Sequence, residues 1–290
     1  MEHEKQLQWF PGHMAEAKRA IEVKLPVIDV VVEILDVRAP LASQSSDLQN
    51  LIKHKRRIVV LNKADLADEK VTHLWSNVFR AAGLQVIVTK ALSEKIKPEL
   101  IKQIKLVYQD KLQQQLTKGI RNPKIRVLIL GLPNVGKSTF INNLVQRKAT
   151  QTADRPGVTR GQQWIKLDSM IDLLDSPGIL APKIANENTK LILALIKALP
   201  PKHLFIEEIA NFALQFLMIN YPEQLAKVYQ IAFAEADNTN ENLANYFTEL
   251  AKKYHFKLSN ETYDVDRAMN LLIHDLQSGK ISRISFEKPN

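Results

Sequence analysis

The first two-thirds of the chain alternates short apolar runs with longer polar stretches. Residues 27–37 (VIDVVVEILDV) are β-branched and almost wholly apolar, as expected of a strand buried on both faces. Similar runs lie at 57–61, 84–89 and 124–130, and stretches of helical length separate them at 47–54, 68–82 and 97–118. Strands that alternate with helices predict an α/β fold with a mostly parallel, doubly wound sheet.

The pattern changes towards the C-terminus. Residues 162–168 and 170–175 predict a hairpin of two further strands, and beyond Pro182 the periodicity is helical only. The expected helices are 186–199, 203–220, 222–229, 241–255 and 264–277. We therefore expect an α/β domain over residues 1–182 and a small all-α domain over 183–290. Its tail, 280–287, suits a short strand or an ordered arm.

Composition narrows the class of protein. The 290 residues contain no cysteine, which excludes disulfides, thiolate metal sites and thiol catalysis. The chain lacks an apolar run of the ~18 residues that a membrane span needs, and it opens without a secretory signal. We expect a cytoplasmic protein without membrane partners.

The positive charge is uneven. The net charge is +9, but residues 90–126 alone carry +7 whereas residues 200–290 carry −3. A single basic cluster is often only a solvated helix face. The asymmetry nevertheless predicts that phosphate-backbone contacts come mainly from the first two-thirds of the chain.

A phosphate-binding loop follows the run at 124–130. Gly131–Ser138 reads G-x-x-x-x-G-K-S between a strand and a helix, where backbone N–H groups and the helix N-terminus cradle phosphates. Lys137 is expected on the β- and γ-phosphates and Ser138 on Mg²⁺. The nucleotide contacts expected from this segment are Asn134, Val135, Gly136, Lys137, Ser138 and Thr139.

Two strand ends earlier in the chain suit a guanine base. Asn62-Lys63-Ala64-Asp65 follows one strand, and the Asp65 carboxylate can accept both the ring N–H and the exocyclic amine of guanine. Lys63 would lie over the base and Asn62 would brace the loop. Thr89-Lys90-Ala91 follows the next strand and suits the guanine carbonyl. Adenine would leave a buried carboxylate unsatisfied, which disfavours an ATP-using enzyme.

A third constellation suits Mg²⁺ and the γ-phosphate. Asp175-Ser176-Pro177-Gly178 is a D-x-x-G at a strand end, so Asp175 would hold Mg²⁺ through water and the Gly178 N–H would contact the γ-phosphate. Thr159, just before the hairpin, is the expected threonine ligand of Mg²⁺, with Thr152 as the alternative.

The order of these motifs is permuted. A conventional GTPase begins with the phosphate loop, whereas here the base-reading segments precede it, and residues 119–123 suit the connector that joins the old ends. The chain thereby resembles the circularly permuted P-loop GTPases and, more narrowly, the ribosome biogenesis GTPase A family. The residues that carry the resemblance are Trp9–Met14, Leu35–Pro40, Asn62–Asp65, Gly131–Ser138, Pro156–Thr159, Gln162–Trp164 and Asp175–Gly178.

This resemblance implies a GTPase that acts late in large ribosomal subunit assembly and cycles between GTP and GDP with Mg²⁺. The implied partners are the large-subunit precursor, its rRNA and ribosomal proteins, with the protein itself a monomer. The subunit would stimulate hydrolysis, and the helical domain would contact rRNA. The net negative charge of this domain, however, argues against a large share of the RNA contacts. The alternative is a nucleotide-gated scaffold with negligible hydrolysis.

The catalytic group is the most open question. Many GTPases place a glutamine after D-x-x-G, but Ile179 stands here and cannot orient water. The resemblance offers His13, although Trp9–Met14 equally suits an aromatic anchor. Asn134 resembles the asparagine of potassium-stimulated GTPases and is the K⁺ candidate. The expected catalytic set is Lys137, His13, Thr159 and Gly178. Asp36 and Arg38 suit a local cap or surface ion pair, or a subunit contact.

Overall fold

The computed structural model describes residues 12–90, 96–145, 163–179, 184, 186–199, 204–232, 239–258 and 262–289. Its sheet has six strands: β1 (Val30–Asp36), β2 (Arg56–Asn62), β3 (Gln85–Val88), β4 (Ile125–Leu130), β5 (Gln163–Lys166) and β6 (Ile171–Asp175). They lie in the order β3-β2-β1-β4-β6-β5, and every neighbouring pair is parallel except β5 with β6. The predicted mostly parallel sheet and its hairpin are confirmed.

Helices cover both faces of the sheet. They are α1 (Gly12–Lys24), α2 (Ser46–Ile52), α3 (Glu69–Ala81), α4 (Ile96–Thr117) and α5 (Lys137–Val145). Val31 and Leu35 of β1 face α1, α2 and α3, whereas Val32 and Ile34 belong to the core that includes α4 and α5. All seven residues of β1 are buried, which explains why five of them are apolar.

Helix α1 is not predicted from the sequence, which offers only a catalytic His13 or an aromatic anchor at Trp9–Met14 for the segment near its start. Within its described side chains, Ala17 and Ile21 are the buried apolar residues. Two such positions give a weak helical period. The helix nevertheless packs both side chains against Ile52 and Leu128.

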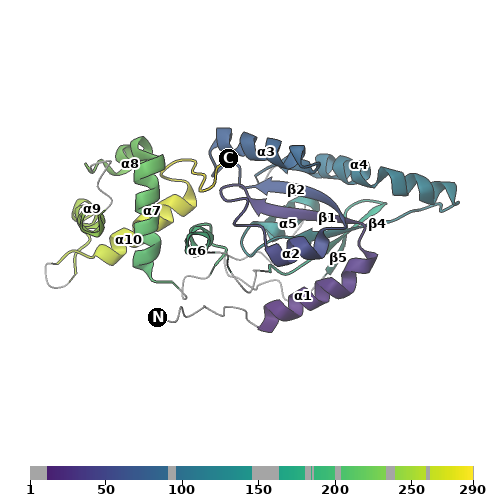
Figure 1. The fold of residues 1–290 in the computed structure, drawn as a ribbon, viewed down its shortest axis with the longest axis horizontal. Helices are drawn as coiled ribbons and strands as arrows, with labels where there is room; N and C mark the ends of the chain where they lie inside the picture. The colour runs from purple at the N-terminus through teal and green to yellow at the C-terminus, as the bar shows by residue number, and fades with distance from the viewer. Residues whose placement is uncertain are drawn as a thin grey trace.

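The C-terminal region is helical, as predicted. Its helices are α6 (Glu187–Leu195), α7 (Ile206–Asn220), α8 (Pro222–Tyr229), α9 (Asn240–Lys253) and α10 (Val265–Ser278). Small residues on α7 and α10, including Ala213 and Ala268, let these two helices approach closely. Figure 1 shows this region beside the α/β part. The expected boundary between residues 182 and 183 falls outside the described residues and stays a prediction.

The tail folds back as an arm rather than a strand. Gly279 (φ 78°) caps the C-terminus of α10, and residues 280–289, here called the C-terminal arm, return to the α/β part. The Ile284 N–H donates to Leu66 O (3.0 Å) and the Phe286 N–H donates to Arg38 O (2.7 Å). The arm therefore connects the helical region with the ends of β1 and β2.

Candidate functional site

The base-reading segment and the phosphate loop meet at one edge of the sheet. Asn62, the last residue of β2, is fully buried, and its Nδ2 donates to Val135 O in the phosphate loop (2.7 Å). Gly136 (φ 97°) abuts the same amide, so a side chain there would collide with it. Segments about 70 residues apart therefore form one site at the carboxyl ends of the strands, where open α/β sheets bind ligands.

The base side of this site is held by backbone hydrogen bonds. The Ala64 N–H donates to Thr89 O (3.2 Å), and the Thr89 N–H donates to Leu61 O (2.9 Å). Asp65 is exposed, and among the described residues its carboxylate has no hydrogen-bond partner. Lys90 is also exposed, and Ala91 lies outside the described residues. The carboxylate of Asp65 is therefore available to a ligand.

Lys63 is anchored by a buried ion network. Its backbone is left-handed (φ 61°), and its Nζ lies 2.9 Å from Asp36 Oδ2. Arg38 reaches both oxygens of the same carboxylate, at 2.9 and 2.8 Å. Burial raises the pKa of Asp36, but the two cations outweigh it and hold that pKa well below its usual range. The expected ion pair of Asp36 and Arg38 forms, and the Asp36 carboxylate also accepts the Arg38 N–H (3.1 Å), but the pair is buried and does not lie on the surface.

The phosphate loop encloses its lysine. Lys137 Nζ donates to Gly131 O (2.9 Å) and to Leu132 O (2.7 Å). Burial lowers the pKa of Lys137 to about 8, although Asp175 opposes this shift. Gly131 has no room for a side chain, because a Cβ there would strike Ile34 O. The loop thus concentrates one ammonium group and the N-terminus of α5 at a single point, which suits phosphate.

Asp175 lies beside this ammonium group at the end of β6. Its side chain is 1% exposed, and within the described ranges neither carboxylate oxygen has a hydrogen-bond partner. Burial raises the pKa of Asp175 to about 6, against the attraction of Lys137. An orphaned buried carboxylate next to a hydroxyl-bearing phosphate loop fits a divalent cation, which supplies the missing partner.

The D-x-x-G segment is packed onto the phosphate loop. A Cβ on Gly178 would come within 2.8 Å of Pro133 Cα and 3.1 Å of Lys137 Nζ. Ser176 Oγ donates to Ile129 O (2.6 Å), which fastens the segment to β4. Ile179 is buried among α1 and α2 residues. The prediction that this position cannot orient water therefore agrees with a core role for Ile179.

Asn134 connects the phosphate loop with the helical region. It has a left-handed backbone (φ 58°), and its Nδ2 donates to Lys197 O, just beyond α6 (2.9 Å). Sequence reasoning missed Lys197, because a backbone carbonyl carries no sequence signal. It also missed the contact of the C-terminal arm with Leu66. Ser138 and Thr139 are half-buried at the start of α5.

Besides Ala91, two further predicted site residues cannot be placed. The side chain of His13 and the whole of Thr159 lie outside the described residues, so their roles stay predictions. Among the described residues, no group of three or more His, Cys, Asp or Glu side chains could hold a metal.

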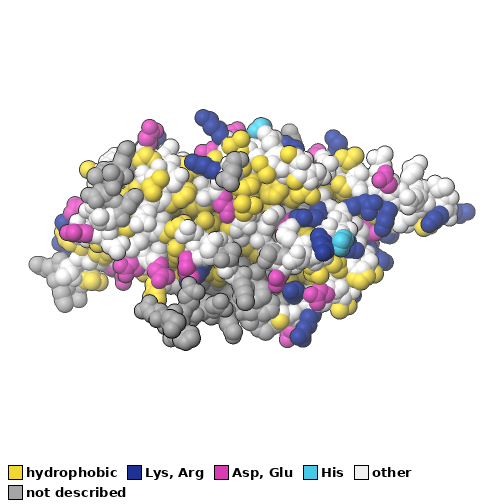
Figure 2. Space-filling view, viewed as in Figure 1, with side chains coloured by type: hydrophobic (Ala, Val, Ile, Leu, Met, Phe, Trp, Pro, Cys, Tyr) yellow, Lys and Arg dark blue, Asp and Glu magenta, His cyan; other side chains and the backbone are white. Residues whose placement is uncertain are grey.

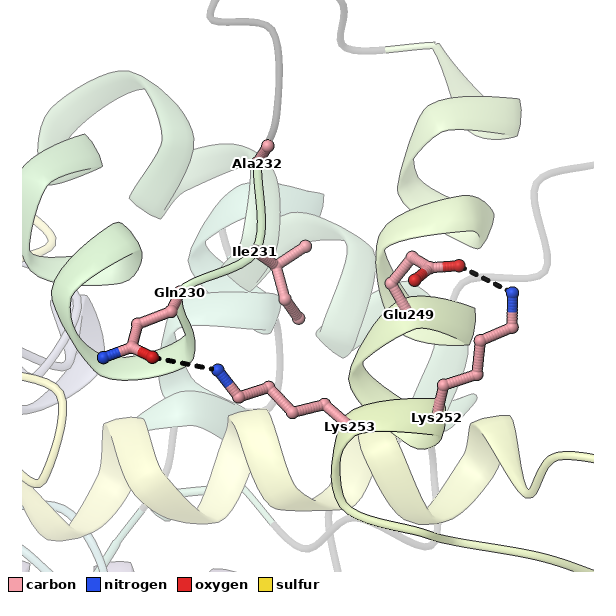
Figure 3. Close-up of a pocket in the computed structure, with 6 residues that line it drawn as sticks. All are labelled: Gln230, Ile231, Ala232, Glu249, Lys252 and Lys253. Atoms are coloured by element: carbon pink, nitrogen blue, oxygen red, sulfur yellow. Dashed lines mark hydrogen bonds and ion pairs between the residues drawn. The ribbon is translucent and has the colours of Figure 1, made fainter.

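A separate pocket lies in the helical region. It is lined by Gln230, Ile231, Ala232, Glu249, Lys252 and Lys253 (Figure 3). Lys252 pairs with Glu249 (2.7 Å), and Lys253 donates to Gln230 Oε1 (3.4 Å). The charged side chains that line this pocket thus have hydrogen-bond partners within it, whereas the carboxylates of Asp65 and Asp175 have none among the described residues. Among the described helices, none combines the length and the apolar character of a membrane span.

Comparisons with known proteins agree with this geometry. A family profile described as "50S ribosome-binding GTPase" matches residues 126–255. Ribosome biogenesis GTPase A of Bacillus cereus is 39% identical over 283 residues, spanning 98% of this chain and 94% of the relative. The protein of the same name from Thermotoga maritima is 32% identical and spans 98% of this chain and 95% of the relative.

A solved structure extends the likeness to the fold. GNP-bound YlqF from T. maritima superposes with a TM-score of 0.65 at 30% identity, covering 95% of this chain and 99% of that one. The likeness spans both the permuted sheet and the helical region. The chain therefore belongs to the ribosome biogenesis GTPase A family and is a GTP-binding enzyme that hydrolyses GTP.

Proposed function

We propose that this GTPase acts in late maturation of the large ribosomal subunit and that the subunit precursor stimulates its turnover. The family profile is described by 50S ribosome binding, and the relatives are named for ribosome biogenesis. The observation that carries the nucleotide part of the proposal is the Asn62–Val135 hydrogen bond, which holds base-reading and phosphate-binding loops together.

Each loop has one role in this proposal. Asp65 reads the guanine edge, Lys63 covers the base, and Asn62 with Thr89 and Ala64 shapes the loop. Lys137 and the N–H groups of 134–139 bind the phosphates. Ser138 and Thr159 would hold Mg²⁺ directly and Asp175 would hold it through water, and the ion would supply positive charge to the phosphates. Lys90 and Ala91 complete the base side.

Slow intrinsic turnover follows from the absence of a polar side chain at Ile179, which is buried in the core. We propose that His13 orients the attacking water once the subunit has positioned the N-terminal segment.

Asn134 is the proposed K⁺ ligand, since its side-chain nitrogen donates to Lys197 O and its amide oxygen is the ligand type that K⁺ takes. Replacing K⁺ by Na⁺ should slow turnover, and equal rates would remove this role.

The nucleotide state is proposed to set the position of the helical region. Gly178 packs against the phosphate loop, and Asn134 bonds the carbonyl that follows α6. Capture of a γ-phosphate by the Gly178 N–H would therefore act on both connections at once. The protein is proposed to work as a cytoplasmic monomer.

The test is co-sedimentation with ribosomal subunits under GDP and under a non-hydrolysable GTP analogue, with phosphate release measured in parallel. We expect large-subunit particles to bind more tightly with the analogue and to raise turnover. Equal affinity in both states would contradict the switch. Tight binding without any stimulated phosphate release would favour the nucleotide-gated scaffold instead.

A further inference from the structure

The edge of the sheet opposite the nucleotide carries a second cluster of charge. At this amino edge, Asp29 accepts from the Tyr108 hydroxyl (3.0 Å) and from the Arg126 N–H (2.9 Å). The Arg56 guanidinium lies 5.7 Å from the centre of the Tyr108 ring. The starts of β1, β2 and β4 thus meet α4 near Tyr108 in the middle of the helix. We call the cations here the basic edge: Lys53, Lys55, Arg56, Lys111, Lys118 and Arg126.

These cations are poorly compensated. Within the described part of the chain, none of the six forms an ion pair with a carboxylate. Burial lowers the pKa of Lys55, Asp29 opposes this shift, and the ammonium of Lys111 lowers it further. Asp29 already accepts two hydrogen bonds. The remaining nearby acids are exposed Asp110 on α4 and Asp172, which lies opposite Arg126 in the β4–β6 register and 4.0 Å from Lys124. Uncompensated positive charge of this kind favours a polyanion.

The basic edge is open to a large partner. Lys53, Lys111, Lys118 and Arg126 are exposed. Lys111 and Lys118 are seven residues apart and so project from nearly the same side of α4 and its end. Figure 2 shows dark-blue side chains gathered over the part of the surface between α2 and the tip of α4. By contrast, acidic side chains predominate near the helical region in the same view.

We propose that the basic edge binds the sugar–phosphate backbone of duplex RNA. This inference rests on the proposed function in ribosome assembly, which supplies RNA as the polyanion. Tyr108, the aromatic residue of this edge, is buried and already faces Arg56, so it cannot stack on an unpaired base. Contacts would then be to phosphates, which position an RNA helix without reading its sequence.

The location separates this surface from the nucleotide switch. Helix α4 has 22 residues, a length of roughly 33 Å, and it runs from the edge that bears the nucleotide loops to the basic edge. A polyanion there would not touch Asn62, Lys137 or Asp175. RNA binding through this edge should therefore have the same affinity with GDP and with a GTP analogue.

The experiment measures binding of a fluorescent 24-base-pair RNA duplex by anisotropy between 50 and 200 mM KCl. The Lys53→Glu/Lys111→Glu variant should lose at least tenfold in affinity, with a shallower dependence of log Kd on log salt. The matched control is Lys102→Glu/Lys227→Glu, which makes the same charge change at exposed positions. Lys102 lies nine residues before Lys111, on the opposite side of α4.

Each outcome decides the proposal. If both double variants lose the same duplex affinity, the loss reflects only net charge and the proposal is overturned. A duplex affinity that differs between GDP and the GTP analogue would overturn it as well. If duplex binding persists in Lys53→Glu/Lys111→Glu while subunit binding is lost, the edge contacts protein and the RNA assignment fails. Fluorescent GDP binding should be unchanged in all variants. If the wild type binds the duplex but does not associate with ribosomal subunits, the proposed function is refuted, whereas RNA binding by the basic edge is supported.

Discussion

At the residue scale, Asn62 matters more for what it supports than for what it could contact. Its side chain is fully buried, and its amide nitrogen reaches across from β2 to the phosphate loop. The same amide closes off the space beside Gly136. One short polar side chain therefore sets the spacing between the base-binding and phosphate-binding halves of the site.

Replacing this side chain should weaken both halves. Asn62→Ala leaves Val135 O without its buried donor, which costs about 1–3 kcal/mol of stability, and we expect at least tenfold weaker GDP binding by fluorescence titration. Asn77→Ala removes an exposed asparagine amide on α3 and should change neither quantity. Unaltered nucleotide affinity in Asn62→Ala would show that the loops keep their spacing without the bridge.

The contribution of Asp36 to the free energy of unfolding should depend on pH. Its carboxylate is paired with Arg38 and Lys63, so its pKa is depressed in the folded protein from an ordinary 3.8. Asp36→Asn leaves two cations uncompensated and should cost about 3–5 kcal/mol at pH 7. A depressed folded pKa contributes stability that is complete above the unfolded pKa and is lost as pH falls towards the folded one.

The measurement is urea unfolding of wild type and Asp36→Asn at several pH values. The difference in unfolding free energy should be constant from pH 7 to about pH 5 and should shrink below about pH 4. A difference that grows on acidification would contradict the ion network, since it would require Asp36 to be protonated more easily in the folded protein.

At the element scale, the C-terminal arm behaves as part of the α/β core although it follows α10. Phe286 is buried, with its ring 5.3 Å from that of Phe216. The Glu287 carboxylate accepts hydrogen bonds from the Leu41 and Ala42 N–H groups (2.6 and 2.8 Å). Trp75 Nε1 donates to the backbone carbonyl of Glu287 (3.0 Å). Burial raises the pKa of Glu287.

Truncating the arm's aromatic anchor should therefore loosen the base-binding loop. Phe286→Ala should cost about 3–5 kcal/mol and speed amide exchange around Leu66, whose carbonyl accepts from Ile284. Phe205→Ala, at a position 76% exposed, is the matched control and should do neither. Stability loss without faster exchange near Leu66 would confine the arm to a packing role.

The same elements show what a sequence can reveal. Helix α3 was predicted to within about a residue because Asp68 caps it and Val71, Trp75 and Phe79 repeat at helical spacing. Helix α1 was missed because few of its side chains are buried. For residues 280–287 the sequence left a short strand and an ordered arm as alternatives. It could not decide between them because the partners of the arm are distant in sequence, as Asp68 is from Ser285, 217 residues away. The motifs were readable because each is local, whereas the Asp36–Lys63 pairing and the Asn134–Lys197 contact arise only in three dimensions.

At the scale of the whole molecule, the two parts are not independent modules. One apolar core runs from β1 and β4 through α6 into α7 and α10. Arg38 Nη1 lies 3.4 Å from Gln277 O, and the C-terminal arm adds further bonds across the junction. The helical region is thus joined to the sheet on both the phosphate side and the base side of the site.

Unfolding should accordingly be a single transition. All three tryptophans precede residue 182, so fluorescence reports the α/β part, whereas far-UV circular dichroism also reports the helical region. The two signals should give the same midpoint in urea, as a two-state protein does. Separate midpoints would show that the junction contributes little, and a variant truncated after Gly279 provides the comparison in which they should diverge.

The position of the arm also bears on how the protein is made. Translation proceeds from the N-terminus, and the Asp68 N–H donates to a hydroxyl that the ribosome adds only 217 residues later. A nascent chain can form the strands early, but the Asp68 N–H lacks this hydrogen-bond partner until Ser285 has been added. The base-binding loop would therefore gain this support only after the α/β part and the helical region have both been synthesised.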